Sequence, residues 1–130
     1  MFEQDYIMRQ IGQLAKMAAR LFFGIEAPSI TEELEDRLSE NENGMLQTLL
    51  EASDAGEICK AEDMLFQMIE ENRKGCLETA ILFYAHLDKK TDDFLEFNNF
   101  SRDEIFEGLS EVIRIFDVDK RLLPDTLLKF

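Results

Sequence analysis

Residues 45–71 carry the feature that most constrains this chain, two apolar stretches at helical spacing separated by a turn of small residues. Apolar side chains recur every three or four positions before Ala55-Gly56 and again after it, which is the pattern of two amphipathic helices. Gly56 can adopt the positive φ that ends a helix, and Ala61 allows the second backbone to approach the first closely. The segment therefore predicts a helical hairpin, and we expect the other elements to pack around it.

The first 24 residues are predicted to form an amphipathic helix whose charge differs from that of the rest of the chain. Residues 1–24 hold three basic and two acidic side chains, whereas the full chain has 14 Lys and Arg against 28 Asp and Glu. One interpretation makes this helix an arm that binds a surface or a partner. Packing on the acidic body of its own domain is favoured, because three basic residues are too few for stable membrane attachment.

A second hairpin is predicted over residues 76–116. Residues 76–88 are apolar on nearly all sides, which is typical of a helix enclosed by neighbours. Ser101 and Glu104 form a capping box that opens the next helix, as Ser29 and Glu32 do earlier in the chain. These patterns predict an all-α fold of antiparallel helical hairpins, with about five helices and a short C-terminal turn.

Two breaks are expected between these helices. The run from Ser39 to Gly44 resembles the start of a calcium-binding loop, with oxygen donors at alternate positions and glycine in the sixth. Leu50 occupies the twelfth position, where calcium needs a bidentate glutamate, so we interpret the run as a polar loop between helices. Residues 94–100 are expected to form a short irregular segment.

The composition excludes several classes of function. A net charge of −14 repels phosphate backbones and anionic lipids, so neither nucleic-acid nor membrane binding is expected. The 45% of apolar residues suffices for the core of one domain, residues 1–130, and no run approaches the roughly 20 apolar residues of a membrane span. Cys59 and Cys76 match no metal or redox spacing, so we expect reduced thiols in a cytoplasmic protein without a metal or cofactor.

The central hairpin resembles a tetratricopeptide repeat. The run Gly56-x-Ile58-x-x-Ala61-x-x-x-Leu65-x-x-Met68-Ile69 follows the order of small and apolar residues in the second half of that repeat. In this family, peptides lie in a concave groove lined by the first helix of each repeat. The resemblance places the partner-binding groove at Asn43, Leu46, Leu50 and Ser53. None of these residues is basic, so the clamp that grips a terminal carboxylate is not implied.

Most of the chain is similar to a small uncharacterised bacterial family of tetratricopeptide-like helical proteins. The similarity begins with Tyr6-Ile7-Met8-Arg9-Gln10-Ile11 and continues through an apolar helix and an acidic body rich in hairpins. It implies an all-helical fold and no known activity, so it transfers no catalytic residues. The apolar surface at Leu46 and Leu50 must be covered either by the N-terminal helix or by a partner, and coverage within the chain is favoured.

Few side chains suit catalysis. His86 is the only histidine, and its place in an apolar helical run favours a structural role. Cys76 lies roughly 15 Å from it along the same helix, at 1.5 Å per residue, which is too far for the two to pair. Cys59 can reach His86 only across helices, and nothing in its surroundings supplies a third group to orient them. We therefore do not expect an enzyme.

The sequence thus favours a non-enzymatic module for protein–protein interaction or self-association, with an acidic exterior that suits basic partners. A homodimer belongs to this class, because the N-terminal helix or the Phe94–Phe100 cluster can supply an apolar patch. The alternative is a small-molecule binder or small enzyme that uses a pocket near His86, with Tyr84 or Cys59 as polar contacts. Convergent polar groups in a pocket favour the alternative, and a flat apolar patch favours the interaction module.

Overall fold

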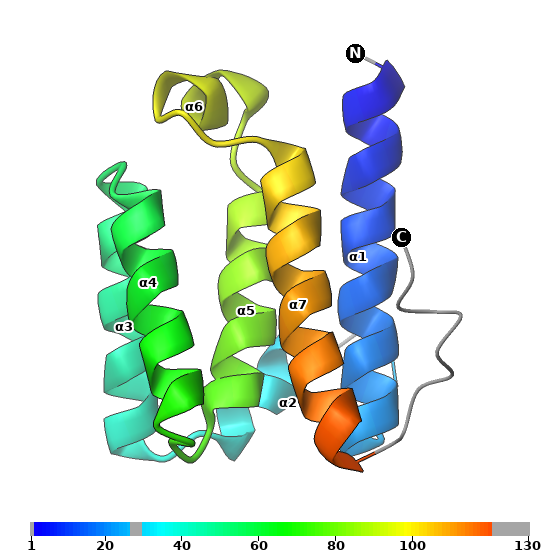
Figure 1. Cartoon of the computed structure of the whole chain (residues 1–130), viewed down its shortest axis with the longest axis vertical. Helices are drawn as coiled ribbons and strands as arrows, with labels where there is room; N and C mark the ends of the chain where they lie inside the picture. The colour runs from blue at the N-terminus through cyan, green and yellow to red at the C-terminus, as the bar shows by residue number, and fades with distance from the viewer. Residues whose placement is uncertain (1, 27–29, 121–130) are drawn as a thin grey trace.

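The computed structural model describes residues 2–26 and 30–120, and every regular element in these ranges is an α-helix (Figure 1). The helices are α1 (Phe2–Phe23), α2 (Ile30–Arg37), α3 (Glu40–Asp54), α4 (Ile58–Glu70), α5 (Cys76–Asp88), α6 (Asp92–Phe97) and α7 (Arg102–Lys120). The all-α prediction is confirmed for the described residues. The predicted number of about five helices is wrong, because two short helices, α2 and α6, accompany the five longer ones.

The fold is organised around α5. Nine of its 13 residues are buried, and it packs against α1, α2, α3, α4 and α7. In Figure 1, α3 and α4 stand on one side of α5, while α7 and α1 stand on the other. The prediction of an enclosed helix at residues 76–88 is confirmed, but the expectation that the hairpin of residues 45–71 holds the centre is wrong. A helix that is apolar on nearly every face can pack against neighbours on all sides, whereas each helix of the hairpin keeps a polar face toward solvent.

The hairpin itself has the predicted bend. Gly56 separates α3 from α4 with φ of +90°, a conformation that side chains rarely allow. A Cβ at this position would also lie 3.1 Å from Cγ of Asn98 and closer still to its amide oxygen. Backbone conformation and close packing therefore both require glycine at this turn. Past the turn, Ala61 and Leu65 are fully buried, as the helical spacing predicts.

The prediction of a polar loop at residues 39–44 is wrong, because α3 begins in this segment. Ser39 Oγ accepts a hydrogen bond from the Glu42 backbone N–H (3.2 Å), and Glu42 Oε1 accepts one from the Ser39 N–H (3.0 Å). This capping box starts the helix, and the polar residues that follow lie on its solvent side. Two further predictions lie outside the described residues: the capping box at Ser29 and the C-terminal turn. The last helix, α7, is four residues longer than predicted, since it ends at 120 and not at 116.

The segment expected to be irregular, residues 94–100, belongs in its first half to α6. The Thr91 side chain accepts a hydrogen bond from the Phe94 N–H (3.1 Å) and so caps this short helix. Leu95 and Phe100 are buried, whereas Phe97 is 86% exposed. The apolar residues of this segment therefore divide between anchoring α6 and facing solvent.

The N-terminal helix packs within its own domain, as the sequence favoured. Its buried residues include Ile11, Leu14, Ala15, Ala18 and Ala19, and it contacts α5 and α7. It does not cover the apolar face of α3, which packs instead against α4 and α5. No helix within residues 2–26 and 30–120 is long and apolar enough to cross a membrane.

Candidate functional site

A hollow of about 340 Å³ lies between α4 and α7, and we call it the α4–α7 groove. Its lining comprises Glu62, Asp63 and Phe66 from α4, and Glu104, Glu107 and Gly108 from α7. Figure 1 shows these two helices on either side of α5. Four carboxylates from two helices therefore meet around one hollow, whose lining includes no basic side chain.

The groove is held to the core through Tyr84 of α5. Tyr84 is fully buried, and its hydroxyl donates a hydrogen bond to Glu62 Oε2 (2.6 Å). A Cβ at Gly108 would lie 2.6 Å from Tyr84 Cζ, so only glycine lets α7 approach the phenol ring this closely. Tyr84 thus fixes one wall of the groove directly and packs against the other.

The groove carries unbalanced negative charge. Burial raises the pKa of Glu62, and the nearby carboxylates of Glu104 and Asp63 raise it further. The hydrogen bond from Tyr84 acts in the opposite direction but does not cancel these effects. Burial, together with Glu62, Glu104 and Asp63, also raises the pKa of the neighbouring Cys59 thiol. A positive charge placed in the groove would relieve this repulsion.

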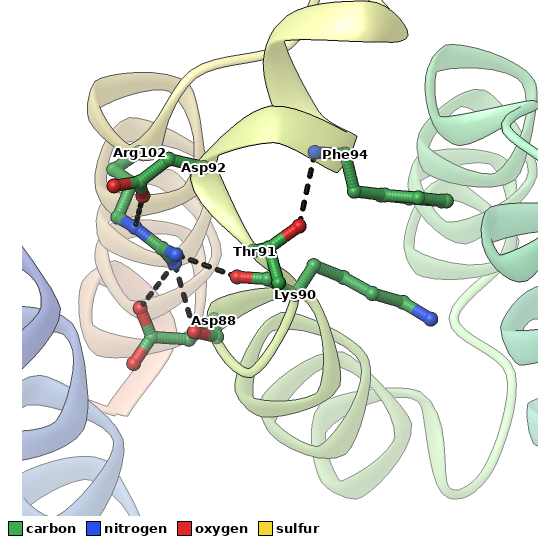
Figure 2. Close-up of polar contacts among 6 residues, drawn as sticks. All are labelled: Asp88, Lys90, Thr91, Asp92, Phe94 and Arg102. Carbon is green, nitrogen blue, oxygen red and sulfur yellow. Dashed lines mark hydrogen bonds and ion pairs between the residues drawn. The ribbon is translucent and has the colours of Figure 1, made fainter.

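A buried arginine fixes the upper end of α7 (Figure 2). Arg102 is 3% exposed, and its Nε donates to Asp92 Oδ1 at 3.0 Å. Its Nη1 donates to the Asp88 carbonyl (2.8 Å) and carboxylate (3.2 Å), and its Nη2 donates to the Lys90 carbonyl (2.6 Å). A second hollow, of about 610 Å³, includes Asp92 and Arg102 in its lining. All three guanidinium nitrogens are already bonded within the chain, so Arg102 is structural and not a ligand-binding group.

Comparison with known proteins identifies a family. The profile described as "Family of unknown function (DUF6483)" matches residues 1–117. The chain belongs to this family. No curated protein and no solved structure matches it. The expectation of an uncharacterised helical family is confirmed at this level, since DUF6483 covers nearly the whole chain.

In this DUF6483 chain, the four residues expected to bind a partner have different environments. Leu46 and Ser53 are fully buried, and the Ser53 hydroxyl donates to the Leu50 carbonyl at 2.9 Å. Leu50 is half-buried, and Asn43 is exposed on the second turn of α3. Leu46 and Ser53 therefore belong to the core, whereas Asn43 and Leu50 retain surface that a partner can reach.

His86 lies in a cluster with Asp54 and Lys90. Its Nε2 is 2.7 Å from Asp54 Oδ1, and Lys90 Nζ donates to the same oxygen. Burial acts to raise the pKa of Asp54, but the hydrogen bonds from Lys90 and His86 outweigh it and lower the pKa. The cluster joins the C-terminal end of α3 to the C-terminal end of α5. Cys59 lies beside the groove carboxylates, and burial raises the pKa of the other thiol, Cys76.

The groove residues gave no distinct signal in the sequence. Glu62 and Asp63 lie far from Glu104 and Glu107 along the chain, and 28 acidic residues spread over helical faces conceal any chosen four. Gly108 in the middle of a helical pattern was the one local hint of close packing. Among the described residues, no group of three or more His, Cys, Asp or Glu side chains could hold a metal ion.

Proposed function

We propose that this chain is a non-enzymatic protein-interaction module whose α4–α7 groove binds lysine or arginine side chains of a protein partner. The observation that carries this proposal is the meeting of Glu62 and Asp63 with Glu104 and Glu107 around one hollow. Burial is the main cause of the raised pKa of Glu62, and the neighbouring Glu104 and Asp63 carboxylates add a repulsion that a partner's cation would relieve.

The chemistry of the lining suits a cationic side chain. Carboxylates accept charge-assisted hydrogen bonds from ammonium and guanidinium groups. Phe66 is half-buried in the lining and offers an aromatic ring, which attracts cations at about 6 Å or less. At about 340 Å³ the hollow lies near the lower limit of small-molecule pockets, roughly 300–1,000 Å³, so it suits a few side chains better than a whole helix.

The charge of the whole chain supports a basic protein partner. A net charge of −14 attracts a basic partner over a longer range than the groove alone and speeds encounter. The Glu104 side chain also has a local role, since its Oε1 accepts a hydrogen bond from the Ser101 hydroxyl (3.1 Å) at the start of α7. Asp63 and Glu107 are exposed and have no such capping role, so they are the better probes of the groove.

A binding titration tests the proposal. A fluorescent lysine- and arginine-rich peptide is titrated with the full chain and with the pair Asp63→Asn and Glu107→Gln. Loss of two exposed charge pairs, at roughly 0.2–1 kcal/mol each, is expected to weaken binding by about 2- to 30-fold. Affinity is also expected to fall as the pH drops through the carboxyl range, where Glu62 with its raised pKa takes up a proton before an ordinary glutamate would.

A matched pair on α2, Glu35→Gln with Asp36→Asn, serves as the control. Both residues are exposed, and the pair removes the same charge from a helix outside the groove. It is expected to retain nearly the wild-type affinity. Equal losses from both pairs would mean that only the overall charge attracts the peptide, and the groove proposal would then be rejected.

The second candidate, a small-molecule binder or small enzyme near His86, is favoured by the contact of its imidazole with the Asp54 carboxylate. The partners Asp54 and Lys90 equally suit a structural link between α3 and α5. We therefore expect His86→Asn to leave peptide affinity within about twofold and to change the free energy of unfolding by about 1 kcal/mol or less, the value of one hydrogen bond. Loss of cellular function from this variant with its thermal unfolding midpoint unchanged would favour the second candidate instead.

The proposal also covers the arrangement of the helices and the compartment in which the protein resides. The α3–α4 hairpin with its glycine turn supports a tetratricopeptide-like arrangement, in which Asn43 and Leu50 form an additional contact surface. Cys59 and Cys76 are both free thiols, which supports residence in a reducing bacterial cytoplasm.

A further inference from the structure

The outward face of α1 carries three basic residues on an otherwise acidic chain. Arg9, Lys16 and Arg20, with the neutral Gln13 among them, are all exposed and follow one another at spacings of three and four residues, so they share one face of the helix. Residues 6–25 contain no acidic residue and form the longest such stretch in the sequence. We call the four residues the basic stripe.

The surface beside the basic stripe contains a hollow as well as charged side chains. A hollow of about 240 Å³ is lined by Gln13, Lys16, Met17, Arg20, Ile25 and Glu26. The lining combines the apolar Met17 and Ile25 with the two cations, and Glu26 is its one carboxylate. Burying apolar surface between ion pairs is the arrangement that stabilises many protein contacts.

We propose that the α4–α7 groove of one copy binds the basic stripe of a second copy of this chain. The inference rests on the proposed function of the groove and names its partner. Lys16 and Arg20 lie one helical turn apart on one face, and the groove presents Asp63 and Glu107 on opposite walls. The chain thus carries both halves of one charge-complementary contact.

The two surfaces lie on different sides of the molecule, so the contact forms between copies. Figure 1 shows α7 between α4 and α1, and α1 turns its buried face toward α5 and α7. The basic stripe therefore faces away from the groove of its own chain. A contact between two different patches adds copies head to tail and produces a ring or an open chain.

The net charge sets the conditions under which copies associate. Two chains of −14 repel each other at low salt, where charges act over long distances. At about 0.15 M salt the screening length is about 8 Å, so the overall repulsion weakens while ion pairs at contact distance persist. Association is therefore expected to be strongest near this salt concentration and to weaken at about 0.01 M and at about 1 M.

Sedimentation equilibrium of the full chain with two charge-reversal variants tests the inference. The groove variant carries Asp63→Lys and Glu107→Lys, and the stripe variant carries Lys16→Glu and Arg20→Glu. For the wild type, the average mass is expected to rise above 15.1 kDa between roughly 10 µM and 1 mM, the range of weak interfaces. Each variant alone is expected to associate at least tenfold more weakly, with circular dichroism confirming that it is folded.

The decisive sample is an equimolar mixture of the two variants. The groove variant retains a normal stripe and the stripe variant retains a normal groove, so this contact can form. The reversed groove and the reversed stripe are also opposite in charge, so the mixture is expected to recover the association of the wild type. A wild type that stays at 15.1 kDa up to about 1 mM, or a mixture that does not associate, overturns the inference. Because the basic-peptide titration needs only one copy, it separates this failure from failure of the groove itself.

Discussion

Replacing Arg102 with alanine is expected to lower the free energy of unfolding by about 3–5 kcal/mol, the usual cost of breaking a buried ion pair from one side. The guanidinium bonds the Asp88 and Asp92 carboxylates and the carbonyls of Asp88 and Lys90 (Figure 2). Its loss leaves Asp88, whose side chain is only 16% exposed, without its cation. Urea unfolding monitored by circular dichroism measures the change.

The pH dependence of this loss identifies its cause. Burial raises the pKa of Asp88 even in the wild type, and Arg102 partly offsets that effect. Without Arg102 the folded-state pKa rises further above the unfolded value, so the charged carboxylate opposes folding more as the pH increases through that range. The loss in free energy of unfolding caused by Arg102→Ala is therefore expected to be largest near neutral pH and to shrink toward about pH 4.

Two further arginine variants serve as controls. Arg114→Ala removes an exposed arginine of the same helix that pairs with Glu111, and it is expected to change stability little. Arg102→Lys keeps the charge but cannot reproduce the planar set of donors to four acceptors, so it is expected to recover only a minor part of the loss. Equal stability of Arg102→Ala and Arg114→Ala would contradict the structural role given to Arg102.

Replacing Gly108 with valine is expected to cost about 3 kcal/mol, toward the upper end of the penalty for overpacking. A Cβ at this position would lie 2.6 Å from Tyr84 Cζ and 2.7 Å from Cε1, well inside normal contact distance. Tyr84 cannot move away easily, because it is fully buried and bonded to Glu62. The same urea unfolding experiment measures this cost.

Gly12→Val is the matched control in α1. A Cβ at Gly12 would have no atom within 4 Å, so the same replacement meets no obstacle. Valine also has a higher helix propensity than glycine, and a small rise in stability is expected. If the two valine variants lost equal stability, the close contact between α7 and Tyr84 would not be what makes Gly108 necessary.

Local patterns predicted the helices well where propensity and packing agreed. The turn at Gly56 and the helix over residues 76–88 follow from positive φ and from apolar residues on every face. The start of α3 was missed because Ser39 to Gly44 is uniformly polar, and a capping box in such a run resembles a loop. The central place of α5 was missed because periodicity reveals how much a helix buries but not how many neighbours it meets.

The candidate site could not be predicted in the same way. Glu62 and Glu107 come together only because Tyr84 and Gly108 bring α4 and α7 to neighbouring positions on α5. No local sequence pattern indicates that arrangement. The chain has 28 acidic residues, so every helix offers carboxylates and no four of them stand out. The family resemblance pointed to α3, where Leu46 and Ser53 prove to be buried.

Nuclear magnetic resonance of the ¹⁵N-labelled full chain, titrated with the basic peptide, tests the groove most directly. The account predicts that backbone amide shifts change over residues 59–67 of α4 and 104–111 of α7, while those of α2 stay constant. Changes centred instead on Asn43 and Leu50 of α3, or spread evenly over all acidic helices, would contradict it.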